Sequence, residues 1–227
     1  MMVGGIDESG RGSIVGPLVV AGIKASEQDM EKWKIWGVKD SKLLSPKKRL
    51  SLYQRLTQYY SYKTIAVSPA QVDEAVMSVF RAKRLNYLEA SIFAQIIDAL
   101  ANPSEPTVFY VDACDINATR FGNLVYNYQK IRPHQEVISR HHMDRDETVT
   151  GAASIIAKVE RDMAIEKLKK EVGIDFGSGY PNSKTRVALS NFVKQTGAIP
   201  SWCRKSWRSW KRWLEPEAYE RLANGNP

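Results

Sequence analysis

The 227-residue chain has few of the residues that mark secreted, zinc-binding or membrane proteins. Its two cysteines, Cys114 and Cys203, are too few for a disulfide framework and form no Cys-x-x-Cys metal motif. The sequence also lacks an apolar run of membrane length, and it does not begin with a basic segment followed by an apolar one. We therefore expect a cytoplasmic protein that does not enter the membrane. Since no apolar pattern requires an oligomer, we expect a monomer.

Acidic residues are in the minority, because 33 Lys and Arg outweigh 25 Asp and Glu to give a formal net charge of +8. This excess favours a polyanionic partner such as nucleic acid. There is no internal repeat and no long Gly/Ser linker, so a domain boundary must be sought in a change of composition. The sequence becomes basic and tryptophan-rich near Pro200. We predict a main domain over 1–199 and a helical region over 200–227 that packs on it.

Apolar runs alternate with helical patterns along the main domain, which is typical of an α/β fold. The run TVFYVD at 107–112 has the β-branched and aromatic character of a buried strand, and Ser45-Pro46 marks the start of a helix. The short connection between the first two strands favours antiparallel pairing. The predicted strands are 2–7, 17–25, 62–68, 107–112 and 136–140. Three helices are predicted over 69–77, 85–100 and 151–172. Another helix is predicted to begin at 46, and a further one, after the strand 107–112, is predicted to end near 130.

Carboxylates follow two of the predicted strands, since Asp7 ends the first and Asp112 ends the fourth. In open α/β sheets the ligand site lies beyond strand ends, so these side chains are candidates for one site. A cluster of carboxylates is costly unless it is protonated or neutralised, which favours a divalent cation, and oxygen-only ligands suit Mg²⁺ or Mn²⁺. Taken alone, each of these acids is more often a turn former or a helix cap.

A third acidic group lies in the stretch HHMDRDE, which offers Asp144, Asp146 and Glu147. The histidines of this stretch, His141 and His142, are possible metal ligands, although adjacent histidines in a polar loop are more often solvated. The residues alone leave open which of these side chains joins the first two acids.

The stretch DESGRG at 7–12 places two acids beside a glycine-rich turn. Successive strand residues point to opposite faces, so Asp7 and Glu8 can share a site only outside regular strand, and we predict a break at Glu8. Gly10 and Gly12 are suited to provide it. They also let the backbone approach a ligand, so that N–H and C=O groups could read a 2′-hydroxyl while Arg11 adds charge-assisted contacts. As a bare tripeptide, Gly-Arg-Gly is otherwise a tight turn.

Five motifs follow one another along the chain. They are DESGRG at 7–12, GVKDSKLLSPKKR at 37–49, VDACD at 111–115, GAASIIAKVERD at 151–162 and GSGYPNSKT at 177–185. Together and in this order they resemble ribonuclease HII, the type 2 ribonuclease H family. The stretch CRKSW at 203–207 is similar to the archaeal and eukaryotic branch. The resemblance implies a ribonuclease-H-like fold, with a central mixed β-sheet flanked by helices and a helical C-terminal extension, and it makes 1–199 a catalytic domain.

The resemblance implies that Asp7, Glu8 and Asp112 are metal-binding catalytic acids. The fourth acid of the family lies seven residues before the small-residue start of the long helix, and this position is Asp144. Asp146 remains a rival, because the residues before Asp144 depart from the lysine-alanine pair that is usual in the family.

The resemblance further implies that Gly10, Arg11 and Gly12 recognise the 2′-hydroxyl and that Tyr180 packs against the sugar at the RNA-to-DNA junction. The implied reaction is two-metal-ion hydrolysis, with Mg²⁺ or Mn²⁺, of the phosphodiester 5′ to a ribonucleotide in an RNA–DNA hybrid or in duplex DNA. The products would carry 3′-hydroxyl and 5′-phosphate ends. A non-catalytic nucleic-acid-binding protein on the same fold and a two-metal DNA nuclease of related fold stay open as alternatives.

Basic residues outside these motif positions are candidates for phosphate contacts. In the tail, the spacing of Trp207, Trp210 and Trp213 places them on one helical face, so we expect the tryptophans to pack inward and the Arg and Lys between them to face outward. A second basic group either flanks the site or forms a solvated helix face. Its members are Lys39, Lys42, Lys47, Lys48 and Arg49.

Overall fold

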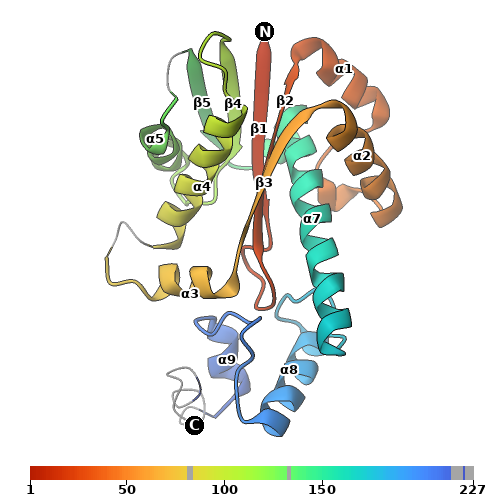
Figure 1. Cartoon of the computed structure of the whole chain (residues 1–227), viewed down its shortest axis with the longest axis vertical. Coiled ribbons are helices and arrows are strands. Elements are labelled where there is room, and N and C mark those ends of the chain that lie inside the picture. Colours follow the sequence, from red (N-terminus) through yellow and green to blue (C-terminus); the bar gives the residue numbers. More distant parts are fainter. Residues whose placement is uncertain (81–83, 132–133, 216–221, 223–227) are drawn as a thin grey trace. The chain divides into compact units, whose positions relative to one another are not determined.

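The computed structural model describes residues 1–80, 84–131, 134–215 and 222 (Figure 1). The chain divides into two compact units. Unit 1 comprises 1–9, 19–66 and 85–160, and unit 2 comprises 10–18, 67–84 and 161–227. The predicted boundary near residue 200 stays a prediction. Within the described ranges, no helix combines the length and the apolar character that crossing a lipid bilayer requires.

Unit 1 is built on a five-stranded mixed sheet with the strand order β3-β2-β1-β4-β5 (Figure 1). The central strand β1 (Met2–Ser9) pairs antiparallel with β2 (Leu18–Ser26) and parallel with β4 (Thr107–Asp112). Strand β4 pairs parallel with β5 (Gln135–Arg140), and β3 (Ser61–Val67) completes the sheet beside β2. The predicted mixed sheet, including its antiparallel first pair, is therefore confirmed.

The helices of unit 1 follow from local signals at their ends. Ser45 caps the predicted helix α2, and its hydroxyl accepts from the backbone N–H of Lys48. Helix α1, which Ser26 caps, and the short helix α6 were not predicted from the sequence. The bounds are α1 Glu27–Trp36, a 3₁₀ turn Ser41–Leu43, α2 Pro46–Tyr59, α4 Leu85–Leu100, α5 Ala118–Tyr128, α6 Met143–Asp146 and α7 Thr148–Val172, of which α7 continues beyond residue 160.

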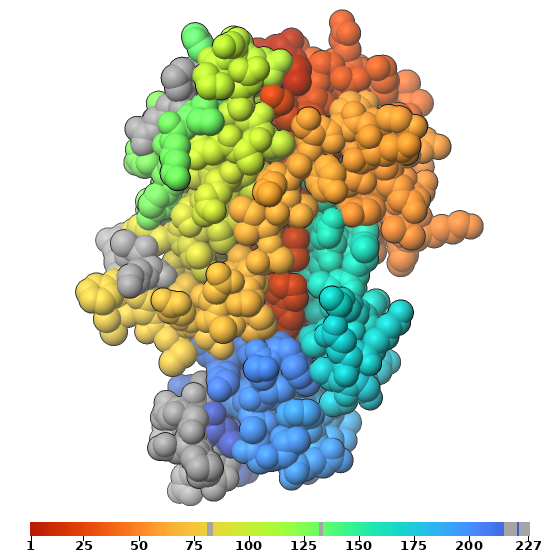
Figure 2. All heavy atoms as spheres, in the orientation of Figure 1, coloured from red at the N-terminus to blue at the C-terminus, as the bar shows by residue number. Residues whose placement is uncertain are grey.

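The start of α7 lies directly against β1. A Cβ atom at Gly5 would lie 2.3 Å from the backbone carbonyl of Val149, so only glycine permits this approach. The space-filling view shows the orange residues of α2 and β3 at the surface, while the red residues at the start of the chain are largely covered (Figure 2). This agrees with the burial of β1 from Val3 to Asp7. This close approach of β1 and α7 sets the position of the carboxyl end of β1 relative to the start of α7.

Unit 2 contains α3 (Pro69–Met77), the later part of α7, α8 (Ser183–Thr196) and α9 (Arg208–Trp213). Helix α3 has the predicted bounds, whereas α8 was not predicted. In the tail, Trp207 precedes α9 as its N-cap, so the prediction of three tryptophans on one helical face is wrong. Trp210 is nevertheless fully buried in the core of unit 2, and Lys211 and Arg212 are exposed, as expected.

Candidate active site

Three carboxylates of unit 1 converge at the end of the central strand pair. Ligand oxygens of Asp7, Glu8 and Asp112 all lie within 4.8 Å of one another. The cause is strand register: β1 and β4 run parallel, with Ile6 opposite Val111, so the next residue of each strand is an acid at the same sheet edge. The two strand-end acids were predicted to meet, and the structure brings them together.

The predicted break at Glu8 is wrong. Strand β1 continues through Ser9, with Glu8 opposite Val20 and Ser9 opposite Val19 on β2. On the other side, pairing with β4 stops at Ile6, so this edge of β1 is open beside Glu8. The backbone N–H of Glu8 donates to Asp7 Oδ1 at 2.7 Å. A carboxylate oxygen of Glu8 nevertheless lies within 4.8 Å of those of Asp7 and Asp112, so the two neighbouring acids share one site although the strand stays regular.

The carboxylates of this cluster are buried together and repel one another. Burial first, and then the charges of Glu8, Asp112 and Asp144, raise the pKa of Asp7 well above its ordinary value. Burial also raises the pKa of Asp112, although the backbone N–H of Met143 donates to its Oδ1 at 2.9 Å and opposes this shift. Such a group of oxygen donors fits a hard divalent cation, Mg²⁺ or Mn²⁺, which would relieve the repulsion.

Asp144 lies beside these three acids. It is 4% exposed on α6, its charge raises the pKa of both Asp7 and Asp112, and its Oδ2 lies 3.7 Å from Lys42 Nζ. Asp146 is exposed, and its charge acts on Glu147 instead. The geometry therefore favours Asp144 over Asp146 as the fourth acid. The exposed His141 and His142 do not belong to the carboxylate cluster found among the described residues.

Hydrogen bonds of Asp40 and Arg49 stabilise the segment that carries Lys42, whose ammonium group lies near Asp144. Asp40 was not predicted to have a role at the site. The buried Asp40 accepts from the backbone N–H of Lys42 at 2.9 Å and from Arg145 Nε at 3.3 Å. Arg49, a candidate for phosphate contact, is buried instead, and its Nη1 donates to the carbonyl oxygen of Ser41 at 2.6 Å. It is therefore structural, whereas Lys39, Lys47 and Lys48 are exposed.

The Gly-Arg-Gly turn belongs to unit 2, where it lies against Arg161 and Tyr180. Gly10 has φ +91°, and a Cβ atom there would lie 2.2 Å from Arg161 Nε. Gly12 is exposed, and a Cβ atom there would meet only Tyr180 Cε1, at 3.8 Å. The guanidinium of the fully buried Arg161 stacks on the Tyr180 ring at 4.8 Å. The structure thus brings the predicted turn and tyrosine together, around an arginine that was not predicted.

The carbonyl oxygens of the turn accept hydrogen bonds inside unit 2. Gly10 O accepts from the backbone N–H and the hydroxyl of Ser13. Arg11 O accepts from Arg204, and Gly12 O accepts from Trp207. These bonds fix the orientation of the carbonyls, and the expectation that both N–H and C=O groups of the turn read a ligand stays a prediction.

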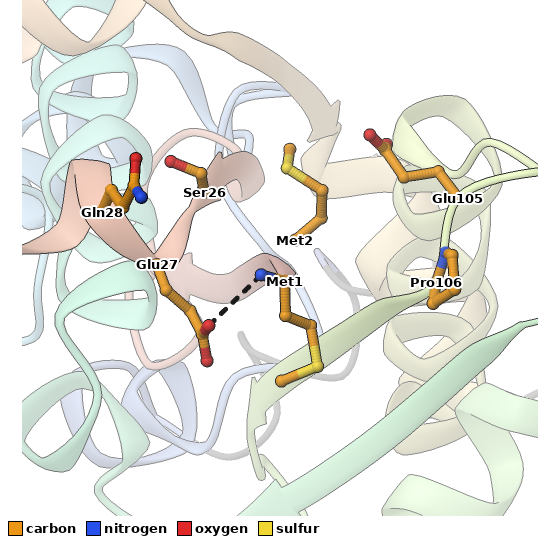
Figure 3. A pocket seen from close by; sticks show the side chains of 7 residues that line it. All are labelled: Met1, Met2, Ser26, Glu27, Gln28, Glu105 and Pro106. Carbon is orange, nitrogen blue, oxygen red and sulfur yellow. Dashed lines mark hydrogen bonds and ion pairs between the residues drawn. The ribbon is translucent and has the colours of Figure 1, made fainter.

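A surface hollow lies at the opposite end of β1 from the acids (Figure 3). The ammonium group of Met1 lies 3.3 Å from Glu27 Oε2 within it. Two carboxylates and two thioethers in its wall do not suit a polyanion. The residues that line it are Met1, Met2, Ser26, Glu27, Gln28, Glu105 and Pro106.

Comparisons with known proteins agree on one family. The family model "Ribonuclease HII" matches residues 4–210. Ribonuclease HII of Methanosarcina barkeri is 40% identical over 217 residues, which are 92% of this chain and 93% of the relative. The ribonuclease H2 structure from Pyrococcus horikoshii OT3 matches with a TM-score of 0.82 and 36% sequence identity. The match covers 98% of this chain and 99% of the Pyrococcus horikoshii chain.

A PCNA:RNase HII complex from Archaeoglobus fulgidus matches with a TM-score of 0.77 and 36% identity, covering 91% of this chain and 95% of its own. With the carboxylate cluster, the shared fold and a family match over nearly the whole chain, the chain belongs to the ribonuclease HII family, metal-dependent endoribonucleases that cleave RNA in RNA–DNA hybrids and at ribonucleotides embedded in DNA.

Proposed function

We propose that Asp7, Glu8, Asp112 and Asp144 bind Mg²⁺ or Mn²⁺ and that the chain hydrolyses the phosphodiester on the 5′ side of a ribonucleotide, leaving 3′-hydroxyl and 5′-phosphate ends. The observation that carries the proposal is the convergence of three carboxylates within 4.8 Å. When bound, divalent cations in such a site activate water and stabilise the departing oxygen. The alternative of a passive nucleic-acid binder gives no reason for this costly cluster.

The acids must be deprotonated to serve as ligands, and their raised pKa values make this step depend on pH. Lys42 opposes the protonation of Asp144, because its ammonium group lies 3.7 Å from the carboxylate. We expect cleavage to fall as the solution becomes acidic, when these carboxyl groups retain their protons and bind cations weakly.

The turn Gly10–Arg11–Gly12 and Tyr180 are proposed to recognise the ribose. The exposed Gly12 lies beside the ring of Tyr180, so a sugar that lies over both meets a backbone amide and an aromatic ring next to each other.

The test compares a DNA duplex that contains one ribonucleotide with an all-DNA duplex of the same sequence, with and without Mg²⁺ or Mn²⁺. We expect a metal-dependent cut on the 5′ side of the ribonucleotide and none in the control. Asp112→Asn should reduce the rate at least about 100-fold while duplex binding is retained. Asp146→Asn is the matched control on a neighbouring exposed acid. Full activity of Asp112→Asn, or a metal-independent cut, would overturn the proposal.

A further inference from the structure

The stretch Cys203–Trp207 has no role in the function proposed above, yet unit 2 is organised around it. Val15 and Cys203 form an isolated antiparallel bridge, and the backbone N–H of Arg204 donates to Ile14 O at 2.8 Å. The stretch therefore runs alongside the segment that follows the Gly10–Gly12 turn. These contacts join residues nearly 190 positions apart in the sequence.

Two side chains of this stretch donate to the turn itself. Arg204, which is fully buried, donates from Nη1 to Arg11 O at 2.7 Å and from Nη2 to Gly16 O at 3.3 Å. Trp207 donates from its indole Nε1 to Gly12 O at 3.2 Å. The Arg204 guanidinium also stacks on the Trp207 ring at 4.8 Å, so the two donors are held as one group.

The donors are themselves fixed in place. The carbonyl oxygen of Arg204 accepts from Trp210 Nε1 at 3.0 Å. The carboxylate of Asp73 on α3 accepts from the backbone N–H groups of Lys205 and Ser206, at 2.8 and 3.0 Å, and from the Ser206 hydroxyl at 2.6 Å. Side chains anchored in this way can hold the turn, because their own geometry is set by the surrounding structure.

The direction of these bonds determines what the turn presents to a ligand. In a planar trans peptide the C=O and the following N–H point in opposite directions. When Arg204 holds the carbonyl of Arg11, the N–H of Gly12 is directed away from Arg204. Gly12 is exposed, so this amide lies at the surface where a ligand can approach. Release of the carbonyls would let both peptide planes rotate, since glycine has little resistance to rotation.

We propose that Arg204 and Trp207 are positioning residues for the Gly10–Gly12 turn. Arg204 fixes the Arg11–Gly12 peptide so that the Gly12 N–H is directed toward the ribose of the substrate, and Trp207 fixes the next peptide, whose N–H on Ser13 closes the turn on Gly10 O. The inference rests on the proposed recognition of the ribose by this turn. Neither side chain needs to touch the nucleic acid. Their effect on cleavage passes through the orientation of two peptide groups, so it depends on the 2′-hydroxyl and not on the phosphates.

The test uses Trp207→Phe, which keeps an aromatic ring under Arg204 but removes the indole donor. Trp213→Phe is the matched control, since it makes the same change in a half-buried tryptophan whose ring packs edge-on against Trp210. Two quantities are to be measured for each variant. One is kcat/KM for cleavage of a duplex that contains one ribonucleotide, and the other is the inhibition constant of an all-DNA duplex added as a competitor. Trp207→Phe should lower kcat/KM about 5- to 10-fold, as expected for loss of one hydrogen bond, and leave the inhibition constant within about twofold. Trp213→Phe should change both values less than about twofold.

Two results would overturn the inference: Trp207→Phe behaving like Trp213→Phe, or Trp207→Phe weakening the all-DNA competitor as strongly as the substrate. Gly12→Ala separates these results from a failure of the underlying proposal. If Gly12→Ala cleaves like the wild type, the turn does not read the ribose and the proposed recognition fails. If Gly12→Ala loses cleavage while Trp207→Phe matches its control, only the positioning role is lost.

Discussion

An alanine at position 12 adds one methyl group to the exposed side of the turn. Gly12 does not have a positive φ, and the added Cβ would meet only Tyr180 Cε1, at an ordinary contact distance of 3.8 Å. The free energy of unfolding should therefore change by no more than about 0.5 kcal/mol, and Tm by about 2 °C or less. The methyl group would, however, cover the exposed surface beside the Tyr180 ring where the ribose is proposed to bind.

Overpacking costs about 1–3 kcal/mol where neighbouring groups cannot move apart. If the sugar must lie directly against Gly12 and the Tyr180 ring, Gly12→Ala should lower kcat/KM on a single embedded ribonucleotide about 10- to 100-fold. The assay is steady-state cleavage of a labelled duplex, with a thermal melt of the same preparation. Cleavage at the wild-type rate, or a Tm lowered by more than about 5 °C, would refute this reasoning.

Gly10→Ala is the informative contrast, because the same change two residues earlier should act on folding. Gly10 has φ +91°, and its Cβ would lie 2.2 Å from Arg161 Nε and 2.8 Å from the backbone oxygen of Pro17. The left-handed backbone costs about 1–2 kcal/mol and the overpacking about 1–3 kcal/mol. A fall in Tm of about 5–15 °C follows for a chain of this size. An unchanged Tm would show that the packing around Gly10 is looser than the structure indicates.

Three further outcomes are expected. Because burial and neighbouring acids raise the pKa of Asp7, its contribution to the stability of the metal-free protein is present below the ordinary carboxyl pKa and is lost as pH rises through the raised value. Asp7→Asn should raise Tm at pH 7 by a few degrees and should reduce the difference in Tm between pH 5 and pH 7. Both values are measured by thermal melts in the presence of a chelator, and a pH difference equal to that of the wild type would contradict the prediction. Tyr180→Phe should retain the stacking on Arg161 and most of the cleavage activity, whereas Tyr180→Ala should lower the cleavage rate at least about tenfold. If both substitutions lowered the rate equally, the hydroxyl of Tyr180 and not its ring would carry the role. If about four exposed cations contact phosphates, duplex affinity should fall about 100-fold between 50 and 200 mM salt, and a flat dependence would exclude such contacts.

Much of the fold follows from short-range signals. The run TVFYVD predicted β4 to the residue, and Pro69 predicted the start of α3, because strand character and a proline in the first helical turn are local properties. Helix α1 escaped the sequence analysis because Trp33 is its one buried residue, so its apolar periodicity is weak. Its caps, Ser26 and the left-handed Gly37, carried the signal that could have found it.

The candidate site was predictable where it depends on strand ends and not where it depends on pairing. Asp7 and Asp112 could be placed together because each was predicted to end a strand; Asp112 does end β4, whereas β1 continues two residues beyond Asp7. The regular strand through Glu8 could not be foreseen, because it depends on where pairing with β4 stops. The bond from Trp207 to Gly12 joins residues 195 positions apart, and no local pattern predicts a partner at that separation.

That separation has a consequence for the order in which the protein is made. The turn at Gly10–Gly12 leaves the ribosome early, but the donors that hold its carbonyls are added 195 residues later. At about 5–20 residues per second, roughly 10–40 s pass before Trp207 is present. A nascent or truncated chain can carry every proposed metal ligand and still lack a fixed turn. The proposed discrimination of the ribose would then be complete only once Trp207 has been synthesised.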